Sequence, residues 1–226
     1  MATQDARARL SPKSMSNAND ILGPKSSDNI LFPLYSTNGI LFPYTPSVSV
    51  GGEVQYDASS FTHSIYSYNA YVKSAPKPIA IEAEFTAQTN DEALYMLAVM
   101  HFLRSVTKSY FGINPYSKAG TPPAVLVFNY LGAMQFNNTP VIVTSFAYTL
   151  PADIDYVPVF RSSGTTNYSA NIGVAGPGMS STENSFVPTH LKLSIELQAQ
   201  YAPIDVRNSF NLDDFRSGKL YNKGYI

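Results

Sequence analysis

The chain has 226 residues and contains no cysteine. This absence excludes disulfide bonds, thiolate metal sites and thiol nucleophiles. The chain also lacks a cationic excess, because 15 Lys and Arg residues stand against 16 Asp and Glu residues and leave a formal net charge of −1. Proteins that bind nucleic acid through its phosphates depend on such an excess. We therefore do not expect a dedicated nucleic-acid-binding protein.

Long apolar runs are missing as well. Nowhere does the chain hold roughly 18 consecutive apolar residues, the length that a membrane-spanning helix needs. The first five residues, Met-Ala-Thr-Gln-Asp, show no basic segment leading into an apolar run, so the sequence does not predict a secretion signal. We expect a protein that is made in the cytoplasm and has no membrane partner.

Charge of either sign is scarce. Charged residues make up 14% of the chain, against about 25% in an ordinary soluble domain, whereas aromatic residues supply 13%. The centres of protein interfaces are depleted in charge and enriched in aromatic side chains. A β-rich fold also raises the share of Tyr and Phe. The composition therefore favours an oligomer whose surface is largely covered by other chains.

The pattern along the chain indicates one domain with two arms. Residues 1–29 are rich in Ser, Asn, Asp and Lys without apolar periodicity, which predicts a flexible N-terminal arm. Residues 30–202 hold the apolar segments of a single β domain. Residues 203–226 turn polar again and predict a C-terminal arm that folds onto a partner. Its anchors are the spaced aromatic residues Phe210, Phe215, Tyr221 and Tyr225.

Alternation of apolar and polar residues predicts the strands. The clearest case is residues 189–201, where Leu191, Leu193 and Ile195 share one face with later apolar residues. Residues 160–188 are rich in Ser, Thr, Gly and Asn and predict a long loop. Prolines in the segments 75–78, 121–123 and 137–140 predict connections. The other predicted strands are residues 65–72 and 79–85, each half-buried, and residues 124–129 and 141–148.

One helix interrupts the strands, over residues 90–111. Thr89 and Glu92 form a capping box at its start, and Lys108 and Gly112 are placed to end it. Its first half is apolar on all sides, which predicts that it is enclosed. We expect Leu94, Leu97 and Phe102 to lock it in the core. The predicted fold is mainly β, a sandwich or barrel of two packed sheets with this single helix.

The sequence predicts no catalytic, cofactor or metal site. His63, His101 and His190 lack the paired spacing of a zinc site. The remaining motifs each miss a required partner and are better explained as surface or turn residues. They are the Ser105-x-x-Lys108 pattern, the pair Asp153 and Asp155, the glycines of residues 173–178, and the pair Glu82 and Glu84.

Five segments resemble structural proteins of contractile-tailed bacteriophages. They are FTAQTNDEA at residues 85–93, HFLRSVTK at 101–108, GTPPAVL at 120–126, FNNTPV at 136–141 and TLPADIDYV at 149–157. The resemblance implies a non-enzymatic, tail-tube-like module in which two sheets pack with one helix. It further implies a ring of six copies, whose inner strands line a channel for the genome.

Within that family, the resemblance favours a baseplate hub or tube-initiator subunit, located in the virion. The expected partners are further copies of the chain, the adjacent tube and baseplate proteins, and DNA as non-specific cargo in the channel. An acidic lumen face would carry Glu82, Glu84 and Glu196, because acidic side chains repel DNA phosphates. The alternatives are a major tail tube protein, a tail terminator, or a β-sandwich that binds carbohydrate on a host surface.

Overall fold

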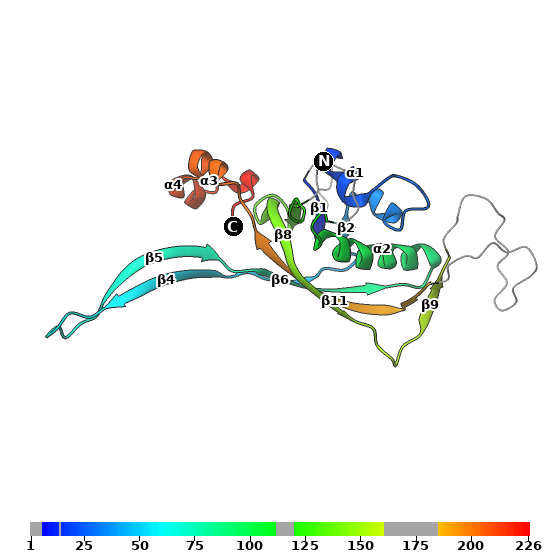
Figure 1. Cartoon of the computed structure of the whole chain (residues 1–226), viewed down its shortest axis with the longest axis horizontal. Helices are drawn as coiled ribbons and strands as arrows, with labels where there is room; N and C mark the ends of the chain where they lie inside the picture. The colour runs from blue at the N-terminus through cyan, green and yellow to red at the C-terminus, as the bar shows by residue number, and fades with distance from the viewer. Residues whose placement is uncertain (1–5, 14, 112–119, 161–184) are drawn as a thin grey trace, which may run out of the picture.

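The computed structural model describes residues 6–13, 15–111, 120–160 and 185–226. Its centre is an antiparallel sheet of seven strands in the order β2-β1-β7-β8-β11-β6-β3 (Figure 1). The strands are β1 (Arg9–Pro12), β2 (Ile40–Leu41), β3 (Ser47–Ser49), β6 (Ile79–Thr86), β7 (Leu126–Tyr130), β8 (Phe136–Thr149) and β11 (His190–Ala199).

This sheet is strongly curled, as its connectivity requires. The edge strands β2 and β3 are separated by residues 42–46 alone. The six residue steps from Leu41 to Ser47 span at most about 20 Å, whereas seven flat strands would be about 29 Å across. The two edges must therefore approach each other. A hydrogen bond of 3.2 Å from the Tyr130 hydroxyl of β7 to the Pro46 carbonyl, just before β3, spans the curled sheet.

Helix α2 (Asn90–Val106) covers the apolar face of the sheet (Figure 1). It starts as the sequence predicts. The Thr89 hydroxyl accepts a hydrogen bond from the Glu92 amide, and the Glu92 carboxylate accepts one from the Thr89 amide, which confirms the capping box. Phe102 is fully buried and Leu97 is nearly so, whereas Leu94 is only half-buried against the core.

The helix ends at Val106, so the predicted end at residue 111 is wrong. The reason lies in the hydroxyl side chains of its last turn. Ser105 Oγ donates to the Phe102 carbonyl at 2.8 Å, and Thr107 Oγ1 contacts the Leu103 carbonyl at 3.2 Å. Such bonds compete with the backbone ladder and favour termination. Gly112, the predicted closing residue, lies outside the described residues.

The N-terminal segment contributes to the core, which corrects the prediction of a flexible arm over residues 1–29. Strand β1 pairs with both β2 and β7, and Leu10 is fully buried. Helix α1 (Met15–Leu22) follows and buries Ala18 and Leu22. The pairing of β1 could not be predicted from the sequence, because β1 is four residues long and its partner strands lie about 30 and 115 residues away in the chain.

Tyr95 on α2 joins the helix to the edge of the sheet. Its hydroxyl accepts a hydrogen bond from the Leu41 amide at 2.8 Å and donates to the Leu41 carbonyl at 3.2 Å. Burial raises the pKa of Tyr95 above its ordinary value, so the group remains a neutral hydroxyl that can serve both roles.

We expect Tyr95→Phe to lower the free energy of unfolding by about 1–2 kcal/mol, because the Leu41 amide of β2 loses its partner. Chemical denaturation followed by far-UV circular dichroism measures the change. Tyr44→Phe is the matched control, since Tyr44 is exposed and its hydroxyl forms a hydrogen bond of 2.9 Å with the Thr86 hydroxyl. Equal effects of the two substitutions would contradict the role of Tyr95.

A second structural unit is the ribbon of β4 (Gly52–Ser59) and β5 (Tyr68–Pro76), which form a two-stranded antiparallel sheet. Figure 1 shows this ribbon projecting away from the rest of the molecule. Residues 52–75 are exposed throughout, so the prediction of a half-buried strand at residues 65–72 is wrong. The predicted connection at residues 75–78 shrinks to Lys77 and Pro78, because β5 runs to Pro76 and β6 starts at Ile79.

The C-terminal segment is folded. It comprises α3 (Pro203–Ser209), α4 (Leu212–Arg216) and the 3-10 helix η2 (Tyr221–Lys223), and η2 contacts β8. Another 3-10 helix, η1 (Phe32–Tyr35), buries Leu34. A second small ribbon pairs β9 (Tyr156–Val159) with β10 (Ser185–Pro188). Most of the predicted long loop, residues 161–184, lies outside the described residues.

The fold is thus mainly β, as the sequence predicts. Two details of that prediction are wrong within the described residues. They hold one large curled sheet and two small ribbons in place of two packed sheets, and four α-helices in place of one. The excess helices are short and lie in the segments that the sequence predicts as arms. Neither arm has the apolar periodicity from which a helix is predicted.

Candidate functional site

The face of the central sheet opposite α2 is polar and open. Along β6 the apolar residues Ile79, Ile81 and Ala83 are buried and the residues between them are exposed, and β11 repeats this alternation. Register places Lys192 beside Glu84, Ser194 beside Glu82 and Glu196 beside Ala80. The three predicted lumen residues, Glu82, Glu84 and Glu196, therefore share one face.

Charge on this face is partly compensated. Glu84 lies 3.8 Å from the Lys192 ammonium and 3.5 Å from His190 Nε2. Glu196 accepts a hydrogen bond of 2.9 Å from the Ser145 hydroxyl. All these groups are exposed, so each contact contributes at most about 1 kcal/mol to stability. With three carboxylates against one ammonium, the face keeps a net negative charge.

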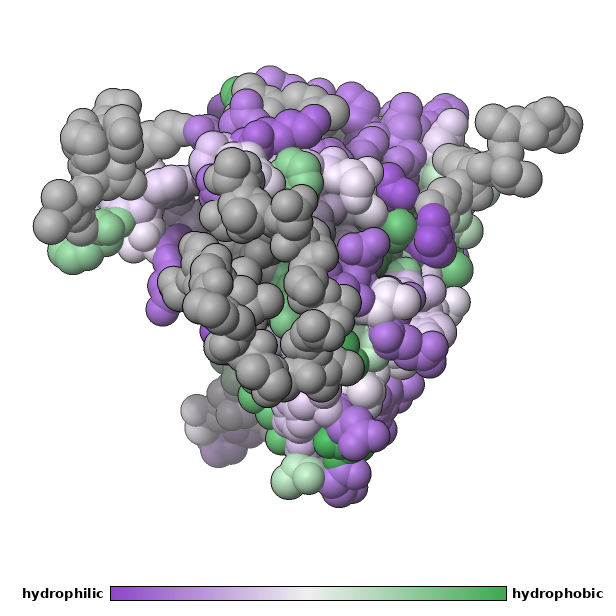
Figure 2. Space-filling view, turned by 90° about the vertical axis from the view of Figure 1, so that its right-hand side faces the viewer, coloured by the Kyte–Doolittle hydropathy of each residue, from purple (hydrophilic) through white to green (hydrophobic). Residues whose placement is uncertain are grey.

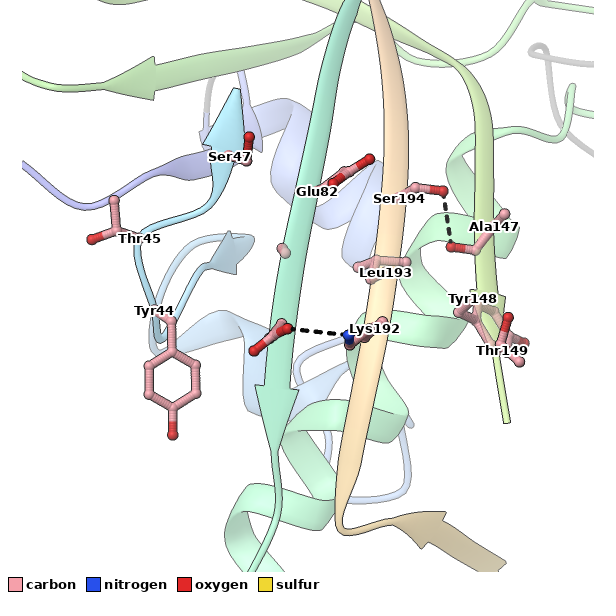
Figure 3. Close-up of a pocket in the computed structure, with 12 residues that line it drawn as sticks. Tyr44, Thr45, Ser47, Glu82, Ala147, Tyr148, Thr149, Lys192, Leu193 and Ser194 are labelled. Atoms are coloured by element: carbon pink, nitrogen blue, oxygen red, sulfur yellow. Dashed lines mark hydrogen bonds and ion pairs between the residues drawn. The ribbon is translucent and has the colours of Figure 1, made fainter. Parts of the chain in front are cut away.

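A shallow groove of about 530 Å³ follows the middle of this face. Figure 3 shows Glu82 and Ser194 on neighbouring strands beside the ion pair between β6 and Lys192. Tyr44 stands at one border, with its ring half-exposed and its hydroxyl bonded to Thr86. The lining combines hydroxyl, carboxylate and small side chains with Tyr148, Lys192 and Leu193. Such a lining can hold water or sugar hydroxyls, and its Ser194 hydroxyl donates to the Ala147 carbonyl at 3.4 Å.

The catalytic candidates are not brought together. His63 lies at the tip of the β4–β5 ribbon, His101 on α2 and His190 at the start of β11. Ser105 uses its hydroxyl to bond a carbonyl of its own helix. Among the described residues there is no cluster of three or more His, Asp or Glu side chains that could hold a metal ion. The glycines of residues 173–178 lie outside the part of the chain that the structure describes.

The β4–β5 ribbon is rich in exposed large apolar side chains. At its tip Phe61 is 70%, Ile65 93% and Tyr66 83% exposed. Along its length Val54, Tyr56, Tyr68, Tyr71 and Val72 are also exposed, and the Tyr56 and Tyr71 rings contact only edge to face at 6.0 Å. Contiguous exposed apolar residues mark interaction surfaces. By contrast, Figure 2 views the opposite end of the molecule, where hydrophilic side chains cover the top and much of the right-hand side.

The aromatic residues of the C-terminal segment are only partly available to a partner. Tyr225 packs against Phe210 at 5.3 Å and against Tyr201 at 5.1 Å between ring centroids, and Phe210 packs against Phe215 at 5.8 Å. Three of the four predicted anchors, Phe210, Phe215 and Tyr225, therefore contact one another within the subunit. Desolvation raises the pKa of Tyr201 to about 12, and its hydroxyl donates to the Gly224 carbonyl at 2.9 Å.

A second groove, of about 560 Å³, lies between this segment and the end of the sheet. Tyr130 and Phe136 on its wall are buried, whereas Leu131, Met134 and Tyr221 are exposed at its rim. Sequence reasoning assigns Tyr221 to a binding segment but misses Leu131 and Met134. The available signal is the sequence Tyr-Leu-Gly-Ala-Met, in which two large apolar residues flank a glycine, a residue typical of turns.

No protein-family model matches the chain, and no curated protein matches its sequence. Within the described residues, no helix has the length and apolar character to cross a membrane. The features of the subunit that bear on its function are the exposed ribbon, the polar sheet face and the C-terminal groove.

Proposed function

We propose that this protein is a non-enzymatic structural subunit that assembles with further copies of itself into a ring. The observation that carries this proposal is the β4–β5 ribbon, which is exposed over residues 52–75. An isolated two-stranded ribbon is only marginally stable in water. Exposed Tyr, Phe, Val and Ile side chains on both of its strands add to the apolar surface that water contacts. A ribbon of this kind is stable when another chain covers it.

The polar sheet face supports the channel in this proposal. A wall that lets DNA pass must not bind its phosphates, and a face with more carboxylates than ammonium groups meets that condition. Small residues such as Ser194 and Ala147 alternate with the charged groups, so the face is smooth and hydrated. Together with the resemblance of five segments, these features favour a contractile phage tail as the setting, and the baseplate hub or tube initiator as the subunit.

The test is the mass of the purified full chain in solution, measured by light scattering, together with negative-stain images. We expect closed rings of identical copies, six in number if the resemblance holds. A monomer at every accessible concentration would overturn the proposal.

The groove beside Tyr44 favours the second candidate, a carbohydrate-binding β-sandwich, because it combines an exposed aromatic ring with hydroxyl and carboxylate groups. A monomer or trimer that binds sugar would favour that candidate.

A further inference from the structure

The apolar side chains at the tip of the β4–β5 ribbon remain exposed to water in the subunit. Residues 60–67, which join β4 to β5, include Phe61, Ile65 and Tyr66, each at least 70% exposed, and contain no Asp, Glu, Lys or Arg. The groove at the C-terminal segment is likewise lined by uncharged residues, many of them apolar. None of its lining side chains is charged, and its rim exposes Leu131, Met134 and Tyr221. Two uncharged apolar surfaces on one chain are thus both open to water.

We propose that the ribbon tip of one copy inserts into the C-terminal groove of the next copy. This inference rests on the proposed self-assembly and names the surfaces that carry it. At about 560 Å³ the groove lies in the range that holds a small organic molecule, so it can take two or three large side chains. The lack of charge on both sides fits the centre of a protein interface, where charged residues are depleted.

The tip cannot occupy the groove of its own subunit. Val50 lines the groove and stands two residues before β4. The eight residues of β4 then carry the chain roughly 26 Å away, at ~3.3 Å per residue. Folding back would break the β4–β5 ladder, which is registered from Gly52 with Pro76 to Ser59 with Tyr68. A ribbon tip that fills this groove therefore comes from another copy.

Leu131 supplies a second and independent observation. Its backbone φ is +56°, a left-handed conformation that is unfavourable for a large side chain, and the neighbouring Gly132 has φ +83°. The strained residue is 54% exposed and gains nothing from burial within the subunit that would offset the strain. Strain of this kind persists at functional sites. Here it holds an apolar side chain at the rim of the groove, where an incoming tip would cover it.

The geometry of the contact also determines the kind of assembly. Tip and groove are different surfaces, so each copy uses its tip on one neighbour and its groove on the other. Such head-to-tail contacts generate closed rings or open helical filaments and do not generate twofold dimers. The contact is thus compatible with the ring of the proposed function.

The absence of cysteine in the native chain makes a direct test possible. We expect a Thr62→Cys chain mixed with a Gln135→Cys chain to form a disulfide-linked dimer on mild oxidation, because these residues lie at the tip and at the groove. A mixture of Thr62→Cys with Asp153→Cys is the matched control, since Asp153 is equally exposed but lies between β8 and β9. Cross-linking that is absent, or equal in both mixtures, overturns the inference.

Leu131→Asn separates assembly from folding. Asn adopts a positive φ readily, so the melting temperature of the subunit should stay the same or rise, while association should weaken at least tenfold. The triple variant Phe61→Ser, Ile65→Ser, Tyr66→Ser should weaken association similarly. Should the native chain form rings that neither variant affects, the tip–groove contact is wrong and the proposed function stands. Should the native chain remain a monomer without cross-linking, both fail.

Discussion

Phe102→Ala should lower the free energy of unfolding by about 3–5 kcal/mol, the largest effect that we expect from any single truncation in α2. Phe102 is fully buried and belongs to the one continuous core of the molecule. Removing its ring leaves a cavity between the helix and the sheet that neither element can close, because the capping box and Tyr95 fix the helix at its first turns. The measurement is chemical denaturation followed by far-UV circular dichroism at one fixed protein concentration.

Leu97 and Leu94 provide a graded comparison on the same helix. Leu97 is 9% exposed, so Leu97→Ala should cost about 2–4 kcal/mol. Leu94 is only half-buried, and Leu94→Ala should cost about 1 kcal/mol, since less apolar surface is lost. This order, Phe102 before Leu97 before Leu94, is the expected result. Equal and small effects at all three positions would show that α2 is peripheral to the core.

The sequence predicts β6, β7, β8 and β11 of the central sheet because the apolar residues of these strands are buried in the core of their own chain. In β6 and β11 every second residue is buried, and this is the alternation that the sequence displays. The start of α2 is predictable for a similar reason, since the capping box is a local device whose two partners lie three residues apart. In both cases a pattern within one short segment of the sequence matches the burial or the hydrogen bonding of that segment.

The ribbon is predicted wrongly for a physical reason. Its alternation of Tyr and small residues indicates that one face is to be covered, and the sequence cannot say by which chain. The structure shows that Tyr66, Tyr68 and Val72 remain exposed in the single subunit. The same pattern that predicts a half-buried strand is therefore consistent with a strand that is buried only after assembly.

The two arms are missed because their contacts are distant in the sequence or very short. Strand β1 contains one large buried residue, Leu10, and its pairing is supplied by β2 and β7. At the other end of the chain, α3 and α4 have seven and five residues, too few to be stable alone. They fold because Tyr201 and Tyr225 bring the segment back to the sheet. Residues 137–140, a predicted turn, lie within β8, where Asn138 takes a positive φ of 55°.

The docking of the C-terminal segment depends on a close backbone approach at Gly224. Its φ is +72°, and a Cβ at this position would lie 2.6 Å from the Asn138 carbonyl oxygen and 2.9 Å from the Thr139 Cα. Gly218 has nearly the same conformation, with φ +75°, but a Cβ there would meet no atom within 4 Å. The two glycines therefore carry the same backbone requirement and differ only in the space beside them.

Gly224→Ala should release the C-terminal segment from β8, whereas Gly218→Ala should not. Both variants bear the conformational cost of a positive φ, about 1 kcal/mol, and only Gly224→Ala adds a clash with backbone atoms, which costs a further ~1–3 kcal/mol. Hydrogen exchange is the measurement. We expect the amides of residues 203–226 to exchange much faster in Gly224→Ala, while those of β6 and β11 keep their protection. Because Tyr225 and Ile226 line the groove that we assign to the ribbon tip, the same substitution should also weaken assembly. If both variants exchange alike, the segment is not held by the approach of Gly224 to Asn138, and its docking must depend on the aromatic cluster alone.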